Sequence, residues 1–363
     1  MAARKNRYGF QEYRGRGSGR SVLIFIVVLL AVLFIAGVVF LFAMGDYINY
    51  TPDGLEINWP WRDKEPSALP EITDPVVPAS DDPVVTGEPT QEPTPTLPPE
   101  PVYEPIAAVT VTTGQLLDGT AVNTVANAGG NAMVVEMKAD SGKLAWQSQT
   151  ELAATLNANA ESDDVADAIR ELALNGDIYL VARVHCFKDP GLVSAGIGAL
   201  LSTRDRVWYD LNGAQWSSPA NQQAADYLSA LCLELSDMGF DEILLDDAGY
   251  PCQGDMNALA NDDNRPGNRT VPVAAFIQRI AGELKEKGVR LSVYAYEKLL
   301  TGDEVYSGMT ASVLAQNAGR VWLDKQVSRE HYESILSVSG LDNVAARVVA
   351  SAANAGEGGS WYR

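Results

Sequence analysis

Between residues 106 and 363, short apolar segments alternate with longer segments of helical periodicity, and this alternation most constrains the fold. Apolar strands that alternate with amphipathic helices predict a parallel sheet, because each helix must return the chain to the start of the next strand. The predicted strands are residues 106–112, 131–137, 177–186, 241–245 and 289–295, followed by 320–323 and 344–350.

Three apolar stripes at helical spacing lie between these strands, and each stops at a glycine: Gly176, Gly239 or Gly288. Ser162 is the expected N-cap of the first helix. The stripes are Val165, Ile169 and Leu172; Ala225, Leu228, Leu231 and Leu235; and Val273, Phe276, Ile277, Ile280 and Leu284. We predict an α/β fold, a (β/α)8 TIM-type barrel, over a doubly wound sheet because the chain has no glycine-rich phosphate loop. Little chain remains after residue 350, so the eighth strand is expected to be short or missing.

The residues before the barrel divide into four segments of different composition. Residues 1–20 carry a charge of +5, and residues 21–44 form an uncharged apolar run long enough to span a membrane. A signal peptide is the competing interpretation, but its apolar region is usually only ~7–15 residues long. We therefore predict a retained single-pass transmembrane helix, with the basic tail in the cytoplasm and the barrel domain, residues 106–363, outside the cell.

Residues 45–63 form a short juxtamembrane collar, in which the turn signal Pro52-Asp53-Gly54 allows a small hairpin. The equally weighted alternative is that its aromatic residues rest at the lipid interface. Residues 64–105 are rich in Pro, Thr and Glu and are expected to be an extended, disordered linker. The net charge of −20 and the pI of about 4.4 argue against a nucleic-acid partner.

Active sites of (β/α)8 barrels lie at the carboxyl ends of the strands, so the polar residues that follow each predicted strand are the candidate site. In chain order they are Glu136, Lys138 and Asp140; His185, Lys188 and Asp189; Asp246, Asp247 and Tyr250; Tyr294, Tyr296 and Glu297; and Asp324 and Lys325. Any single acid here is more often a helix cap or a solvated loop residue. The adjacent pair Asp246-Asp247 is the exception, because two carboxylates at a barrel mouth are costly unless they are used or paired.

Carboxylate pairs together with aromatic side chains suit carbohydrate chemistry. One carboxyl group protonates the leaving oxygen while the other attacks the sugar or activates water, at a separation of roughly 5–10 Å. Trp208 and Trp216, in the long loop after the third strand, are the expected platform for sugar rings. No metal and no cofactor are expected, and the sequence leaves the oligomeric state open.

Four segments occur in an order that resembles one known family: NAMVVEMKADSG (131–142), YLVARVHCFKDP (179–190), VWYDLNGAQWSSPAN (207–221) and MGFDEILLDDAGYP (238–251). The chain resembles the DUF4015 family of glycoside hydrolase-like TIM barrels over roughly residues 109–349. The residues that match the family's motifs are Arg183, Lys188 and Asp189; Trp208, Asp210, Trp216, Pro219 and Asn221; and Gly239, Phe240, Asp241, Glu242, Asp246 and Pro251. The resemblance implies a barrel that acts on, or binds, a polysaccharide.

The chain departs from the family pattern near the key acids. Glu136 and Ala139 stand where the family usually has Asp, and Tyr294 stands where it tends to have Asp. The family motif DYVRFP is replaced by residues 246–251, DDAGYP, so its arginine is missing. An arginine beside a carboxylate holds that carboxylate ionised, so its loss predicts altered specificity or loss of hydrolysis.

Two functions follow. The first is a membrane-anchored extracellular glycoside hydrolase, of retaining type, that acts on a cell-wall or other envelope polysaccharide. The alternative is a catalytically inactive glycan-binding or envelope-assembly protein. In the first, Asp246 is the nucleophile, Glu297 the general acid, and Asp247 and Asp189 reserve candidates. The expected substrate-binding residues are Glu136, Lys138, Arg183, Lys188, Trp208, Trp216 and Tyr250.

The cysteines and histidines leave alternatives open. Cys186 and Cys252 follow neighbouring strands and form either a disulfide or ordinary thiols, whereas Cys232 is expected to be buried on a helix. His185 either orients a carboxylate or is a hydrogen-bonded structural residue. His331 is expected on the surface.

Overall fold

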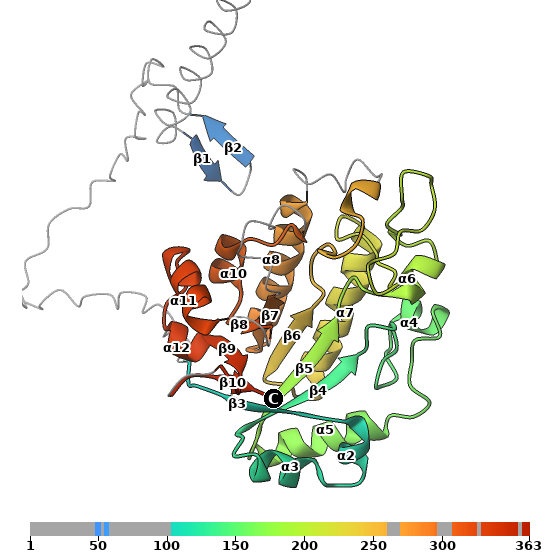
Figure 1. Ribbon diagram of the computed structural model, residues 1–363. Coiled ribbons are helices and arrows are strands. Elements are labelled where there is room, and N and C mark those ends of the chain that lie inside the picture. The colour runs from blue at the N-terminus through green and yellow to red at the C-terminus, as the bar shows by residue number, and fades with distance from the viewer. Residues whose placement is uncertain are drawn as a thin grey trace, which may run out of the picture. The chain divides into compact units, whose positions relative to one another are not determined.

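The computed structural model describes residues 48–51, 54–57, 103–259, 269–295, 307–324, 328–354 and 358–363 (Figure 1). These residues belong to two units, one within residues 1–94 and the other within residues 95–363. In the first unit, β1 (Ile48–Thr51) and β2 (Gly54–Ile57) pair antiparallel, so the hairpin that the turn signal Pro52-Asp53-Gly54 allows is present. The predicted apolar segment 21–44 and nearly all of the linker lie outside the described residues. No helix in the described part of the chain is long and apolar enough to cross a membrane.

The second unit is a closed parallel barrel of eight strands, in the order β10-β3-β4-β5-β6-β7-β8-β9. The strands are β3 (Ala107–Val111), β4 (Ala132–Lys138), β5 (Tyr179–His185), β6 (Glu242–Asp246), β7 (Arg290–Ala295), β8 (Arg320–Leu323), β9 (Val348–Ser351) and β10 (Trp361–Tyr362). The predicted barrel is confirmed. The eighth strand is short, as expected: its two residues pair with β9 on one side and β3 on the other and so close the sheet.

Helices connect the strands on the outside of the barrel (Figure 1). They are α2 (Thr113–Leu117), α3 (Ala121–Asn127), α4 (Glu151–Thr155), α5 (Asp164–Asn175), α6 (Pro190–Ser194), α7 (Gln222–Met238), η2 (Met256–Ala258), α8 (Thr270–Glu286), α10 (Ala311–Asn317), α11 (Arg329–Val338) and α12 (Val344–Arg347). The stripes predicted for α7 and α8 are buried, and α7 ends at Gly239, whose φ of 110° suits a residue without a Cβ. The N-cap of α5 is Asp163 and not Ser162, whose hydroxyl donates to Asp164 instead.

The segment 344–350, predicted as one strand, begins with the short helix α12, and only its last three residues belong to β9. An apolar run this short does not distinguish strand from helix by itself. The side chain of Arg347, at the end of α12, connects this helix to the chain before β8, because its guanidinium donates to the carbonyl oxygens of Ala318 (2.7 Å) and Gly319 (2.9 Å).

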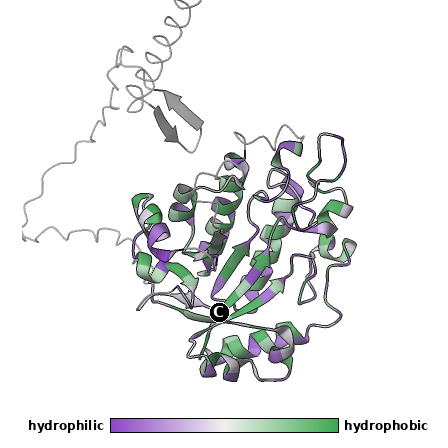
Figure 2. Ribbon diagram, in the orientation of Figure 1, coloured by the Kyte–Doolittle hydropathy of each residue, from purple (hydrophilic) through white to green (hydrophobic). Residues whose placement is uncertain are grey.

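Alternation along the strands separates two cores. One face of the sheet packs against the helices, and the other fills the barrel interior. The interior side chains are Ile106, Ala108, Ala132, Val134, Val181, Leu244, Tyr294, Trp322, Val349 and Tyr362. In Figure 2 the strands β4 to β6 are mostly in hydrophobic colours. Because the period is two, Glu136, Arg183, His185 and Asp246 continue the interior face toward the carboxyl ends of β4, β5 and β6.

No disulfide joins Cys186 to Cys252, both of which lie in the described part of the chain, so the disulfide alternative is wrong. Cys186 and Cys232 are both fully buried, as was expected for Cys232. Burial raises the pKa of both thiols, which keeps them protonated.

Candidate active site

The pairing of β5 with β6 brings the central residues of the candidate site together. Arg183 lies opposite Leu244 and His185 lies opposite Asp246, so these side chains share one face. The ladder continues beyond both strands, because Cys186 N donates to Asp246 O (2.8 Å) and Phe187 N donates to Asp247 O (3.1 Å). The backbone therefore holds both aspartates at the barrel mouth.

Asp246 is fully buried, and both of its carboxylate oxygens are hydrogen-bonded. Oδ2 accepts from Nε of Arg183 at 2.8 Å and also from its Nη2, while Oδ1 accepts from the backbone N–H of Asp247 at 2.8 Å. The guanidinium of Arg183 also lies over the ring of Tyr294, 5.3 Å from its centre. Although the family arginine after β6 is missing, Arg183 therefore supplies a positive charge to Asp246 from the neighbouring strand.

His185 lies between carboxylates from two strands. Its Nδ1 is 2.6 Å from Oδ2 of Asp247, and its Nε2 is 3.4 Å from Oε2 of Glu136. Burial alone would lower the pKa of His185, but the contacts with Asp247 and Glu136 and the charge of Asp246 outweigh it and raise the pKa to about 9. The imidazole is therefore charged at neutral pH, and its contact with Glu136 lowers the pKa of that carboxyl group. These contacts fit both interpretations of His185, as a residue that orients a carboxylate and as a hydrogen-bonded structural residue.

Asp247 is 5% exposed and has a φ of 51°, a left-handed conformation that non-glycine residues seldom adopt. Such conformations cost of order 1–3 kcal/mol and concentrate at functional sites. In this left-handed conformation, Oδ2 of Asp247 lies 2.6 Å from Nδ1 of His185.

A second ion pair lies closer to the rim. Lys188 Nζ is 2.7 Å from Oδ2 of Asp140. Burial lowers the pKa of Lys188, but Asp140 and the charges of Asp247 and Asp210 outweigh burial and raise it. Lys188 is partly exposed and so remains available to a ligand, as its predicted binding role requires.

Lys138 and Asp189 do not reach the mouth. The register between β4 and β5 shifts between Glu136 and Lys138, which turns Lys138 away from the interior face, because an extra residue in one strand inverts the alternation. Lys138 is fully buried, lies 2.8 Å from Oδ2 of Asp189 and donates to the carbonyl oxygen of His185. Asp189 is 1% exposed and caps α6 by accepting from Leu192 N (3.0 Å). The predicted substrate-binding role of Lys138 and the reserve catalytic role of Asp189 are therefore wrong. The two side chains are buried and pair with each other outside the barrel mouth.

Trp208, Trp216 and Tyr250 are also buried, at 4%, 6% and 2% exposure. The two indole N–H groups donate to Asp255 O (3.0 Å) and to Oδ2 of Asp210 (3.1 Å). The ring of Tyr250 lies under the guanidinium of Arg269. Since a sugar stacks on an exposed ring face, the predicted platform and the binding role of Tyr250 do not fit these positions. The side chains pack the loop after β5 instead.

Glu297, the predicted general acid, lies outside the described residues, as do Tyr296 and Lys325. Asp324, which follows β8, is described and partly buried.

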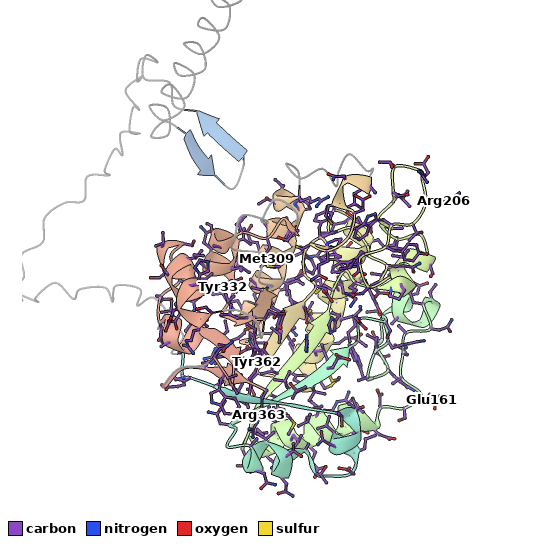
Figure 3. All side chains as sticks on the ribbon, viewed as in Figure 1. Glu161, Arg206, Met309, Tyr332, Tyr362 and Arg363 are labelled. Atoms are coloured by element: carbon purple, nitrogen blue, oxygen red, sulfur yellow. The ribbon has the colours of Figure 1, made fainter. Side chains whose placement is uncertain are left out.

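Tyr362, labelled in Figure 3, is a functional candidate that no sequence pattern indicates, although it forms part of the interior wall. Its hydroxyl donates to Leu323 O (2.7 Å) and lies 3.2 Å from the hydroxyl of Tyr294. The period-two alternation of β7 would have placed Tyr294 inside the barrel. The partner Tyr362 could not be found in this way, since a two-residue strand carries no period.

Donor atoms of His185, Asp246 and Asp247 lie within 4.8 Å of one another, a spacing that could suit a metal ion. Arg183 already donates twice to Asp246 Oδ2, however, and a protonated His185 has no lone pair for a metal. These contacts favour a hydrogen-bonded charge network at this site.

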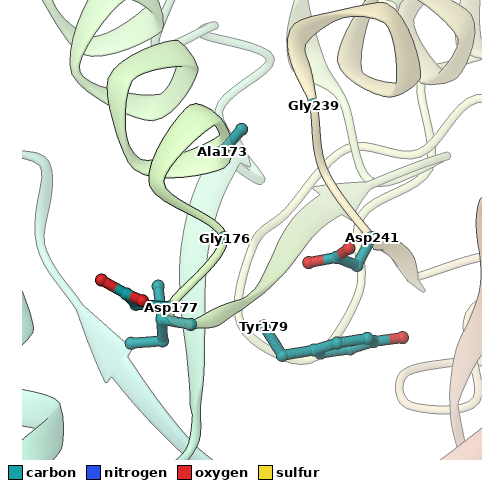
Figure 4. A pocket seen from close by; sticks show the side chains of 7 residues that line it. Ala173, Gly176, Asp177, Tyr179, Gly239 and Asp241 are labelled. Carbon is teal, nitrogen blue, oxygen red and sulfur yellow. The ribbon is translucent and has the colours of Figure 1, made fainter.

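A pocket of about 260 Å³ lies at the opposite end of the barrel (Figure 4). Its walls include Gly176, Asp177 and Tyr179 before and at the start of β5, and Gly239 and Asp241 before β6. The Asp241 carboxylate already accepts from Leu180 N (2.8 Å). Because the amino ends of barrel strands usually serve stability, we do not place the reaction there.

The closed parallel eight-stranded barrel is a TIM-type barrel, and its paired carboxylates lie at the carboxyl ends of the strands, where such barrels carry their active sites. The family comparison agrees: residues 106–319 match DUF4015, described as "Putative glycosyl hydrolase domain". The chain belongs to this family. Among curated proteins, none matches the chain.

Several solved structures resemble the chain at low similarity. A hypothetical protein from Ruminiclostridium thermocellum is 24% identical, with a TM-score of 0.44, over 51% of this chain and 96% of that one. The PgaB (BpsB) glycoside hydrolase domain from Bordetella bronchiseptica is 13% identical, with a TM-score of 0.49, over 69% and 83%. A chitinase from Chromobacterium violaceum is 16% identical, with a TM-score of 0.39, over 67% of each chain. At these scores they carry no conclusion about activity.

Proposed function

We propose that this protein is a glycoside hydrolase that cleaves a cell-wall or other envelope polysaccharide at the mouth of its barrel. The observation that carries the proposal is the pair Asp246 and Asp247, whose carboxylate oxygens lie within 4.8 Å at the carboxyl end of β6. Two carboxylates at the carboxyl end of a barrel strand suit glycoside hydrolysis, in which one carboxylate attacks the sugar or stabilises the developing positive charge. Membership of the family supports the same reaction class.

The charges around the carboxylates suggest how the roles divide. Arg183 stabilises the ionised form of Asp246, as a nucleophile or as an electrostatic stabiliser of an oxocarbenium-like transition state requires. Asp247 and Glu136 face the charged His185, and Asp140 faces Lys188, so each is also stabilised as an anion. A general acid must instead hold a proton. The role of acid therefore falls to Glu297, which follows β7, as the sequence predicts.

We further propose that residues 21–44 anchor the protein in the cell membrane, with residues 1–20 in the cytoplasm and the barrel outside. The uncharged run and the +5 tail support this arrangement. The proline-rich residues 64–105 support a spacer, which at ~3.1 Å per residue in extended form would let the barrel reach an envelope polymer. Resistance to alkaline extraction from membranes is expected, and release of the full-length chain by that treatment would contradict the anchor.

Complete burial of Asp246 favours a second candidate, a glycan-binding protein without catalysis, because a nucleophile must touch the sugar carbon. In that case the Arg183–Asp246 pair would be structural, and binding would depend on exposed groups such as Glu136 and Lys188.

One experiment separates the two. Full-length protein and its Asp246→Asn variant are incubated with a panel of purified envelope glycans, and new reducing ends and bound glycan are both measured. Asp237→Asn, an exposed substitution on α7, is the matched control. A hydrolase predicts that Asp246→Asn lowers turnover at least about 100-fold while the control does not. Equal turnover in wild type and Asp246→Asn refutes the assignment, and binding without any wild-type turnover supports the second candidate.

A further inference from the structure

His185 occupies an unusual position for one of only two histidines in the chain. Its ring is the contact between the carboxyl ends of β4 and β6, with Glu136 on one nitrogen and Asp247 on the other. Glu136 is half exposed, whereas Asp247 is almost fully buried. The imidazole therefore joins a carboxylate that a ligand can reach to one that lies inside the mouth.

The charged groups around His185 come from each of the three strands at this point. β4 supplies Glu136, β5 supplies Arg183, and β6 supplies Asp246, with Asp247 following it. Two further cations are near: Lys188 lies at the rim, and Lys138 donates to the carbonyl oxygen of His185 at 2.8 Å. Arg183 donates to Asp246, and the imidazolium is a cation in direct contact with Asp247.

The backbone conformation of Asp247 depends on contacts such as the one with His185. A φ of 51° is unfavourable for aspartate, and it needs surrounding interactions to persist. The bond to His185 is one such interaction, together with the backbone bond from Phe187 N to Asp247 O. Without the imidazolium, the Asp247 carboxylate would lose this 2.6 Å contact.

We propose that His185 is a positioning residue, which as an imidazolium fixes the carboxylates of Asp247 and Glu136 in the geometry that the reacting sugar requires. The expected effects on kcat and on the pH profile rest on the proposed hydrolase function, whereas the contacts of His185 do not. No bond to substrate is made or broken by His185, and its two N–H protons remain on the ring throughout.

The inference predicts three measurements on the full-length protein. In wild type, activity falls as pH rises through about 9, because the imidazolium is then lost. His185→Asn keeps an N–H donor near the position of Nδ1 but removes the charge, so kcat falls by as much as about 100-fold with KM little changed, and the alkaline limb disappears. The control His331→Asn alters an exposed residue on α11 and is expected to leave kcat and the pH profile unchanged.

Histidine-selective NMR tests the geometry without turnover. With two histidines, the His331→Asn variant assigns both resonances. His185 is expected to titrate near pH 9, and Asp247→Asn is expected to lower that midpoint, whereas Asp237→Asn is not. A midpoint near the ordinary 6.5, or one unaffected by Asp247→Asn, overturns the inference. So does a His185→Asn enzyme with wild-type kcat and pH profile. If wild type cleaves no glycan, the proposed function fails, and the NMR result still decides whether His185 holds Asp247.

Discussion

Replacing Lys138 with methionine is expected to destabilise the barrel strongly, although sequence reasoning placed this lysine among the substrate-binding residues. Lys138 is 0% exposed and Asp189 is 1% exposed, and their charged atoms are 2.8 Å apart. Lys138→Met leaves the Asp189 carboxylate buried without its cation, and removing one partner of such a pair costs about 3–5 kcal/mol. Since domains are typically stable by only about 5–15 kcal/mol, this is a large share of the free energy of unfolding.

Urea unfolding of the full-length protein, followed by tryptophan fluorescence, measures this cost. The double variant Lys138→Met/Asp189→Asn is expected to recover part of it, because asparagine removes the buried charge and still accepts from Leu192 N. Lys287→Met is the matched control, since it breaks an exposed pair with Asp237 and is expected to cost at most about 1 kcal/mol. A Lys138→Met cost as small as that of the control would refute the reasoning, as would a double variant less stable than Lys138→Met alone.

Two further predictions concern the same region. The pKa of His185 is raised on folding from about 6.5 to about 9, so its contribution to stability, about 3 kcal/mol, is fully present below pH 6.5 and is lost as pH rises through 9. Urea midpoints of wild type and His185→Asn should therefore converge at high pH, and a constant difference from pH 6 to 10 would contradict this. Gly142→Ala is expected to cost about 1–3 kcal/mol, because Gly142 has a φ of 83° and an added Cβ would meet the Asp189 carboxylate. Gly119→Ala, with a φ of 75° and no atom within 4 Å of the added Cβ, should cost less in the same assay, and equal losses would show that the contact with Asp189 does not matter.

Local sequence pattern was sufficient for most of the barrel, because the longer strands and helices each carry their own period. The stripe that ends at Gly239 and the apolar run before Asp246 each predict an element without knowledge of any other. Failures occurred where the pattern was too short, as at residues 344–347, which form a helix and not part of a strand. Residues 361–362 likewise show no period, although they close the barrel.

Roles at the site were harder to predict, because they depend on which atoms meet across strands. The missing family arginine suggested that Asp246 lacks a cation, yet Arg183 supplies it from β5. The order of residues after β4 suggested that Lys138 points into the mouth, yet the register shift after Glu136 turns it toward Asp189. Trp208 and Trp216 had the right chemistry for sugar stacking, but the loop buries both.

The sequence by itself determined the alternation of strands and helices, the family, and the position of Asp246 and Asp247 directly after the fourth barrel strand. These follow from hydrophobic periodicity and from local order along the chain, which are the same in any structure that buries those apolar faces. Only the tertiary structure decided that Arg183 holds Asp246, that His185 joins Glu136 to Asp247, and that Lys138 and Asp189 lie behind the site. The physical reason is that strand register and a single bulge set which side chains face one another, and neither is encoded in one strand alone.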